Sequence, residues 1–359
     1  MKNEKEVLST NHSIKVESPM KNIKVLGIDL AKKVFQLHGA DETGKKVFSK
    51  RLSRFKLIEF ASNLKPCTIA IEACGAAHYW ARLFQAMGHE VRMMAPQFVK
   101  PYVQANKNDA NDAAGIAEAA TRPKMKFVGI KTVEQQDMLL VHRSRQLAVK
   151  HRTAQVNQIR GLLAEYGIIF PQGMSAMKKL PALLGESEGE LSALARRHFH
   201  RLYERYLSYE EEVASYDAQI EEMAKEEPRC QELMKIEGIG PLTATAALAS
   251  IGDPTVFKNG RQVGAWLGLV PKQHSSGSKT RLGGISKRGD RYLRTLLIQG
   301  ARAVVRSCHK KTDKRSLWVT SKKEQKSYNV AAVALANKNS RMIWAILVTG
   351  ECYSPSIAA

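Results

Sequence analysis

The sequence predicts a fold of the α/β class joined to a largely α-helical part, and three observations support this prediction. Short apolar runs that are typical of strands alternate with helical segments up to about residue 131. Two long amphipathic stretches follow, and beyond Pro228 the chain consists of short helices, glycines and a dense basic run. We therefore expect an α/β domain over residues 22–131, a helical region over 132–228 and a mainly helical C-terminal domain over 229–359.

Each element of the α/β domain has its own signal in the sequence. Three strand-like runs open it as a meander, and "DETGK" places a glycine at the tip of a turn. The later runs alternate with segments of helical spacing. In chain order we expect strands at 23–29, 34–40 and 46–51, a helix at 55–64, a strand at 67–73, a helix at 77–87, a strand at 89–95, a short helix after Pro96, a helix at 108–120 and a last strand at 126–130.

The first 21 residues are polar and lack the apolar segment of a secretory signal, so we expect a disordered extension there. Met20 directly precedes the first strand-like run, which leaves Met1 and Met20 as alternative translation starts. The longest apolar runs, such as Ile343–Val348, are too short to span a bilayer. We therefore expect no membrane partner. The five cysteines are scattered without zinc-like spacing or a disulfide framework, which favours the reducing cytoplasm, and we expect a prokaryotic, nucleoid-associated protein.

Two long helices are predicted in the middle of the chain. The first runs from Val133 past residue 160, and the segment "YGIIFPQG" breaks it. The second runs from about Leu191 to Lys225 with apolar residues along one stripe. Two such helices with a break between them indicate an antiparallel hairpin or coiled coil, with ordinary bundle helices as the alternative.

The balance of charge points to a polyanionic partner. The net charge is +22, and residues 258–326 hold 18 Lys and Arg against three Asp and Glu. An excess of this size in one segment favours contact with a nucleic-acid backbone over a merely solvated surface. A membrane surface is the rival partner, but no long basic amphipathic helix beside an anchor is present in the sequence.

Four carboxylates follow a pattern that predicts a metal site. Asp29 ends the first predicted strand, and Glu72 ends a later one. Asp109 and Asp112 are three residues apart, on one face of a predicted helix. In an RNase H-like sheet, acids at these places converge, and hard oxygen ligands of this kind suit Mg2+. Taken singly, Asp29 fits a strand-end turn and Asp109 fits a charge at a helix N-terminus.

The C-terminal part carries two candidate sites for phosphate. "IEGIGPLTA" resembles the turn of a helix-hairpin-helix module, in which Gly238 and Gly240 would let the backbone approach a phosphate; a simple helix-helix turn is the alternative. In "KQHSSGSKTR", two serines precede Gly277. A serine attacks only when its proton is removed or its target is polarised, and His274 is the one evident base nearby. From spacing alone, a phosphate-binding loop is the simpler interpretation and a nucleophilic serine is the alternative.

The basic residues around these serines are candidates for binding a nucleic-acid backbone. They are Lys272, Lys279, Arg281, Lys287, Arg288, Arg291 and Arg294.

The motifs "GIDLAKKVF", "IEACG", "NKNDANDA", "GIGPLTA", "LGLVPKQHSSG", "GGISKRGDRYLR" and "ANKNSRMIWAIL" occur together and in one order. This set resembles the DEDD-type insertion-sequence transposases of the IS110 family, and most closely its IS1111 subgroup, to which the Piv-type DNA invertases are related. The resemblance extends over about residues 22–350.

The resemblance implies a RuvC-like N-terminal domain whose DEDD metal site falls on Asp29, Glu72, Asp109 and Asp112, with Mg2+ or Mn2+ as cofactor. It also implies a C-terminal transposase domain whose catalytic serine maps to Ser276, with Ser275 in reserve. The implied reaction cleaves and exchanges DNA strands through a phosphoserine intermediate. The implied partners are donor and target DNA, a noncoding bridge RNA in some members, and further copies of the chain, a dimer assembling to a tetramer through a coiled coil. In such tetramers, the RuvC-like domain of one subunit meets the transposase domain of another.

Three other functions compete with this one. A RuvC-like, metal-dependent nuclease would hydrolyse DNA junctions while the serine merely binds phosphate. A non-enzymatic scaffold would bind nucleic acid without needing the acids. An actin-like sugar kinase, suggested by "GIDLA", lacks a second glycine-rich phosphate motif and does not fit the basic charge.

Overall fold

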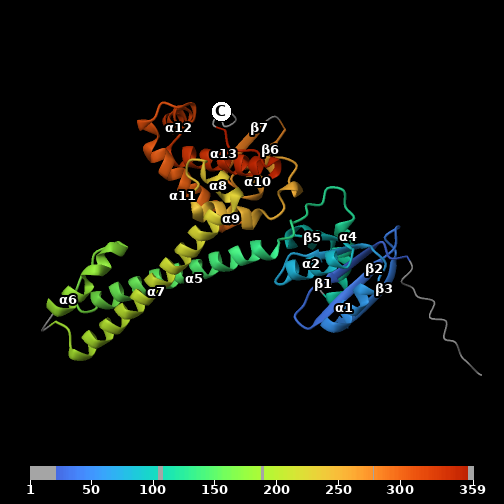
Figure 1. Ribbon diagram of the computed structural model, residues 1–359, viewed down its shortest axis with the longest axis horizontal. Helices are drawn as coiled ribbons and strands as arrows, with labels where there is room; N and C mark the ends of the chain where they lie inside the picture. Colours follow the sequence, from blue (N-terminus) through green and yellow to red (C-terminus); the bar gives the residue numbers. More distant parts are fainter. Residues whose placement is uncertain (1–21, 104–107, 187–189, 278, 355–359) are drawn as a thin grey trace, which may run out of the picture. The chain divides into compact units, whose positions relative to one another are not determined.

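The computed structural model describes residues 22–103, 108–186, 190–277 and 279–354, in two compact units that meet in sequence at Ile130 and Lys131 (Figure 1). The extension expected over residues 1–21 lies outside the described residues. The first unit is the predicted α/β domain. The second contains both the long middle helices and the C-terminal helices.

A five-stranded sheet in the order β3-β2-β1-β4-β5 forms the first unit. The meander β1-β2-β3 is antiparallel, whereas β4 and β5 extend the sheet parallel to β1. The strands are β1 Val25–Asp29, β2 Val34–Ala40, β3 Lys46–Ser53, β4 Thr68–Glu72 and β5 Glu90–Met94. These five strands agree with the sequence prediction. The expected strand at 126–130 is wrong, because this run forms only an isolated bridge between Phe127 and Met94.

Helices cover both faces of this sheet, and strand alternation decides which residues each face receives. On one face, α1 (Arg54–Ser62) and α2 (Ala77–Ala86) enclose Leu26, Ile28, Ile69 and Ile71 with Trp80. On the other face, Ile116 and Ala117 of α4 (Asp109–Ala120) join Val25, Ala70 and Met94. Between β5 and α4 lie α3 (Pro96–Val99) and the 3-10 turn η2 (Lys100–Tyr102).

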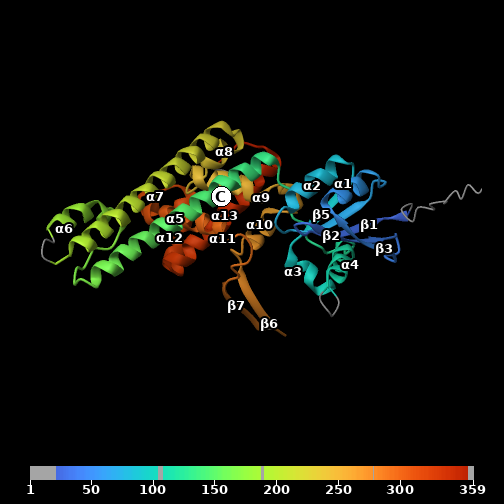
Figure 2. The same cartoon turned by 90° about the horizontal axis from the view of Figure 1, so that it is seen from below.

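The second unit begins with α5 (Val133–Ala164), which lies beside α7 (Ala193–Glu226) along most of its length (Figures 1 and 2). Arg145 is 2.5 Å from Asp217, and Arg152 is 3.1 Å from Glu210. Because the partner numbers fall as the α5 numbers rise, the two helices are antiparallel. Between α5 and α7, where the sequence indicated only a break, η3 (Met174–Lys179) and α6 (Leu180–Glu186) pack on the C-terminal part of α5 and the N-terminal part of α7.

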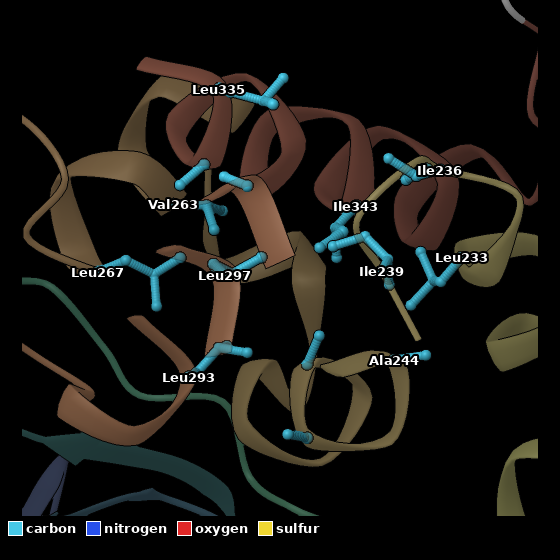
Figure 3. Packing of buried hydrophobic residues seen from close by; sticks show 14 of the residues in the cluster. Leu233, Ile236, Ile239, Ala244, Val263, Leu267, Leu293, Leu297, Leu335 and Ile343 are labelled. Atoms are coloured by element: carbon cyan, nitrogen blue, oxygen red, sulfur yellow. The ribbon is translucent and has the colours of Figure 1, made fainter. Parts of the chain in front are cut away.

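The remaining helices pack around one apolar core, whose central residues include Leu233, Ile239, Val263, Leu297 and Ile343 (Figure 3). The expectation of short helices here is wrong for α11 and α13, which have 17 and 22 residues. The elements are α8 Pro228–Met234, α9 Pro241–Ile251, η4 Pro254–Val256, α10 Gly260–Trp266, α11 Arg291–Ser307, η5 Cys308–Lys310, α12 Lys314–Gln325 and α13 Tyr328–Thr349, with the hairpin of β6 Pro271–Ser276 and β7 Lys279–Ile285.

None of the helices in the described part of the chain is both long and apolar enough to cross a membrane. The five cysteines are all free thiols.

Candidate active site

Two of the predicted acids lie side by side because their strands are neighbours. β1 and β4 pair in parallel with Ile28 opposite Ile71, so Asp29 and Glu72 end adjacent strands at the same sheet edge. Alternation then decides which way they face. Asp29 shares the face of Val25, and Glu72 shares the face of Ala70, which is the face covered by α4. Both side chains are half-buried.

A glycine brings α4 to the same edge. A Cβ atom on Gly27 would stand 2.3 Å from the Ala113 carbonyl oxygen and 2.7 Å from the Ala117 nitrogen, so only glycine allows α4 to lie this close to β1. Asp112 directly precedes Ala113, and Asp109 stands one turn earlier. The first turn of α4 therefore lies beside the end of β1, where Asp29 is found.

The start of α4 is fixed by a side-chain cap. The Asn108 side chain accepts a hydrogen bond of 2.8 Å from the Asn111 backbone nitrogen. Both acids of the helix lie in its first turn, where the positive end of the helix dipole favours negative charge. The cap and the dipole thus account for two acids at this end of α4 even before any cation binds.

The structure places Asp29 and Glu72 next to each other, but it does not bring all four acids into one metal-binding cluster. In the described ranges, no three His, Cys, Asp or Glu side chains are close enough to hold one ion. The Asp109 carboxylate lies instead 3.7 Å from the Arg51 guanidinium, and both side chains are exposed. The donor set nonetheless fits a divalent cation, because four carboxylates supply hard oxygen ligands and their mutual repulsion favours a counter-ion.

Cys74, which the sequence did not indicate as a site residue, lies close to Glu72 and Asp29. Burial raises the pKa of the Cys74 thiol, and the negative charges of Glu72 and Asp29 raise it further. Both carboxylates therefore act on one point just beyond β4. The thiol follows Glu72 in "IEACG", which was its only signal in the sequence.

The serines lie on an exposed β-hairpin rather than on the irregular loop that we expected. β6 pairs antiparallel with β7, and the described residues of both strands are exposed, except for half-buried Ile285 (Figure 2). Gly277 follows Ser276 in the left-handed region at φ +55°, a conformation that favours glycine. The Ser-Gly sequence therefore marks the point where the chain turns.

Strand alternation puts the two serines on opposite faces of the hairpin. Ser276 pairs with Lys279 and His274 pairs with Arg281, so these four side chains share one face. Ser275 pairs with Thr280 on the other face, where its hydroxyl accepts a 3.0 Å hydrogen bond from the Gln273 amide. Ser276 alone therefore shares a face with a histidine and two cations.

The other predicted DNA-binding cations divide into two groups. Lys272, Lys279, Arg281, Lys287, Arg288 and Arg291 are exposed on or near the hairpin. Arg294 is different, because only 7% of its surface is exposed. Its guanidinium donates to the carbonyl oxygens of Leu267 and Arg288, at 2.9 and 2.8 Å. The prediction that Arg294 binds DNA is wrong, since its donors stabilise the turn before α11.

Gly238 is also used differently from the prediction. It has φ +84°, and a Cβ atom on it would stand 2.8 Å from the Gly300 carbonyl oxygen. The glycine therefore lets the turn between α8 and α9 lie against α11, so its role is helix packing rather than approach to a phosphate. Gly240 precedes α9 in open space, where a Cβ atom would meet nothing within 4 Å, so no neighbouring atom opposes the approach of a phosphate.

Sequence reasoning also missed a buried polar cluster around His142, which is 1% exposed. Thr245 donates its hydroxyl proton to the Pro241 carbonyl, so its oxygen accepts from His142 Nε2 at 3.0 Å. His142 Nδ1 then accepts from the Tyr292 hydroxyl at 2.9 Å. Burial and the nearby Arg145 charge lower the pKa of His142 to about 4, so the ring is neutral at pH 7.

A mixed sheet with carboxylates at the ends of β1 and β4, followed by a basic helical unit, is the arrangement that the sequence motifs predicted. Comparison with protein families identifies the class as DEDD transposases. A DEDD transposase model of the IS110 type matches residues 26–168, and the model described as "Transposase IS116/IS110/IS902 family" matches residues 230–316.

Curated relatives extend this similarity over nearly the whole chain. A probable family 20 transposase of Pseudomonas aeruginosa is 48% identical over 93% of this chain and 99% of its own length. The transposase for insertion sequence element IS1111A of Coxiella burnetii is 47% identical over 93% of this chain and 92% of its own. That for IS1328 of Yersinia enterocolitica is 37% identical over 93% and 100%. The chain belongs to the IS110/IS116/IS902 family of transposases, enzymes that cleave and rejoin DNA.

Proposed function

We propose that this transposase cleaves and exchanges DNA strands through a phosphoserine intermediate formed by Ser276. One observation carries the proposal: Ser276 stands beside the turn of an exposed hairpin, on the same face as His274, Lys279 and Arg281. In the step, Ser276 Oγ loses its proton and bonds to phosphorus, and the bridging P–O bond breaks. The proton reaches the departing oxygen, and a second strand end later reverses the reaction. Ser275, turned to Gln273, is the reserve nucleophile.

The residues on the Ser276 face have complementary tasks. Lys279 and Arg281 hold the phosphate oxygens and stabilise the charge that develops on them. His274 is two residues from Ser276 on the same strand face, so their Cα atoms are about 7 Å apart. At this spacing the imidazole is placed to accept the serine proton through a bridging water molecule.

The acids of the first unit supply the second half of the chemistry. We infer that Asp29, Glu72, Asp109 and Asp112 hold Mg2+, which when bound polarises the scissile phosphate. Asp29 and Glu72 provide fixed ligands from the sheet edge, and the acids of α4 complete the set once Asp109 leaves Arg51. Mn2+ satisfies the same ligands.

We further propose that the two half-sites meet across subunits, in a dimer that assembles to a tetramer. The hairpin carries no carboxylate, and the acids lie in a different compact unit. The antiparallel α5–α7 pair is the candidate coiled coil for assembly. Its ion pairs recur at a heptad interval, since Arg145 and Arg152 are seven residues apart, as are Glu210 and Asp217.

The basic surface accounts for the remaining partners. The net charge of +22 exceeds what one short DNA contact needs, and we propose that a noncoding bridge RNA binds alongside donor and target DNA. The helix-hairpin-helix-like turn at Gly240, before α9, is a candidate contact for one of these backbones.

Strand cleavage by matched serine variants tests the chemistry. Ser276→Ala is expected to abolish cleavage, whereas Ser275→Ala, on the opposite face of the same strand, retains it. Asp29→Asn is expected to abolish cleavage as well. If Ser276→Ala still cuts DNA while Asp29→Asn does not, the protein is a metal-dependent nuclease that uses water, and the phosphoserine proposal is overturned.

A further inference from the structure

A large groove lies at the root of the hairpin and belongs to no part of the site described above. Its volume is about 1540 Å³, and β7, α10, α12 and α13 contribute to its walls. Leu282 and Gly284 come from the hairpin, Trp318 from α12, and Lys338 and Arg341 from α13. The groove is wide enough for a nucleotide chain, since drug-sized ligands occupy pockets of ~300–1,000 Å³.

The groove has a positive wall. Arg261, Lys326, Lys338 and Arg341 line it, and its described lining residues include no Asp or Glu. Burial lowers the pKa of Lys338, and repulsion from Arg315 and Arg341 lowers it further, so Lys338 lies in a positive environment. Such a surface is complementary to an anion.

The floor of the groove is apolar and aromatic. Trp318 is half-buried, and the Lys338 ammonium lies 5.0 Å from the centre of its ring. Leu282 and Val330 are exposed beside it, at 63% and 50%. Aromatic rings with cations around them are the platform on which unpaired bases stack while their phosphates are neutralised. A duplex would hide its base faces and leave this floor uncovered.

Two glycines lie in the wall that the hairpin forms. A Cβ atom on Gly284 would meet no atom within 4 Å, and one on Gly283 would be 3.9 Å from Lys272. The backbone of β7 is thus bare toward the groove, which lets a strand approach closely. The same β7 strand leads to Lys279, opposite Ser276. From Leu282 to Lys279 the strand rises about 10 Å, close to the length of three stacked nucleotides.

We propose that this groove binds unpaired nucleotides of the DNA strand that Ser276 attacks, with a base stacked on Trp318 and phosphates at Lys326, Lys338 and Arg341. The proposal rests on the function proposed above for Ser276. Its occupant is DNA, because the hairpin that forms one wall is the hairpin that carries the attacking hydroxyl.

Binding of short oligonucleotides to the full chain, without divalent cation so that no strand is cut, tests the groove separately from the chemistry. The probes are a fluorescent single-stranded oligothymidylate of about 12 nucleotides, its duplex and the matching oligouridylate. Trp318→Leu is expected to weaken binding of the single-stranded DNA about tenfold. Trp318→Phe retains most of the affinity, because it keeps an aromatic face.

Two controls separate the groove from general effects of charge and folding. Leu317→Ala changes the exposed neighbour of Trp318 on α12, and the affinity is expected to stay the same. Lys326→Gln is expected to reduce the slope of log Kd against log salt by about 0.7, whereas Lys323→Gln, on the preceding helix α12 and outside the groove, leaves single-strand affinity nearly unchanged. Gly284→Val fills open space rather than the core. If Trp318→Leu unfolds, Gly284→Val tests the groove instead, and it is expected to weaken binding of single-stranded DNA as well.

Three results overturn the proposal: equal losses for duplex and single-stranded DNA, a loss confined to the RNA probe, or no loss in Trp318→Leu and Gly284→Val when both are folded. The function of Ser276 is judged separately by strand cleavage. Failure of the groove would leave a cleaving Ser276 intact, and failure of Ser276→Ala to stop cleavage would leave the binding result standing.

Discussion

Substitution of Gly27 by alanine is expected to separate the acids without touching any of them. The added Cβ would stand 2.3 Å from the Ala113 carbonyl oxygen, whereas ordinary contact begins at 3.4 Å. The first turn of α4 must therefore move about 1 Å away from β1, and Asp112 moves with it. Overpacking of this kind costs roughly 1–3 kcal/mol. A displacement of about 1 Å near the reacting groups lowers the rate about a hundredfold.

Three measurements on Gly27→Ala follow from this reasoning. Urea unfolding gives the loss of stability, strand cleavage gives the loss of rate, and calorimetry with Mn2+ gives the loss of metal affinity. Gly161→Ala is the matched control, because a Cβ atom there meets nothing within 4 Å and alanine favours the helix α5. A folded Gly27→Ala protein with unchanged cleavage and Mn2+ affinity would refute the claim that the contact of α4 with β1 positions the acids.

The remaining predictions concern single side chains. Arg294→Gln is expected to lower the free energy of unfolding by about 2–3 kcal/mol, because buried carbonyls lose their charged donor, whereas exposed Arg291→Gln weakens DNA binding at unchanged stability. Urea unfolding and salt-dependent DNA binding distinguish the two variants, and the reverse pattern would contradict a structural role for Arg294. Because the pKa of His142 is lowered in the folded state, the unfolded state binds the extra proton, and the free energy of unfolding falls by about 3 kcal/mol in all as pH falls from 6.5 to about 4. Urea unfolding should show a weaker pH dependence in His142→Asn, and an unchanged dependence would contradict this role of His142. Arg51→Gln is expected to change stability by less than about 1 kcal/mol and to tighten Mn2+ binding about twofold to threefold, since the exposed pair with Asp109 competes with the metal; weaker Mn2+ binding would contradict this.

The sheet could be predicted because its strands are apolar runs separated by clear turns. The run at 126–130 has the same composition, yet only Phe127 bridges to Met94, and only Val128 adds a backbone hydrogen bond, to Met93. The run has five residues, as do β1, β4 and β5, so neither its length nor its composition shows that it bridges at one point only.

The hairpin was missed for the opposite reason. Serines, lysines and glycines are typical of loops, and β6 and β7 bury nothing that would show as an apolar alternation. The sequence Gly277-Ser278 between two short runs was nonetheless a usable hairpin signal.

The positions of site residues could be predicted only where the order of neighbouring strands determines them. Asp29 and Glu72 end neighbouring strands, so their place follows from the strand order. The burial of Arg294 and the contact of Gly238 with Gly300 depend on packing between segments far apart in the chain. Spacing in the sequence gives no information about such contacts, and for this reason both residues were assigned to DNA.

Trapping the covalent intermediate shows whether Ser276 is the nucleophile. The full-length protein is incubated with Mg2+ and a DNA substrate nicked beside the cleavage site, so that the released end diffuses away, and the protein–DNA adduct is digested and located by mass spectrometry. A phosphodiester on Ser276 is expected, absent in Ser276→Ala and retained in Ser275→Ala. An adduct on another residue, or cleavage that proceeds with no adduct at all, would contradict it.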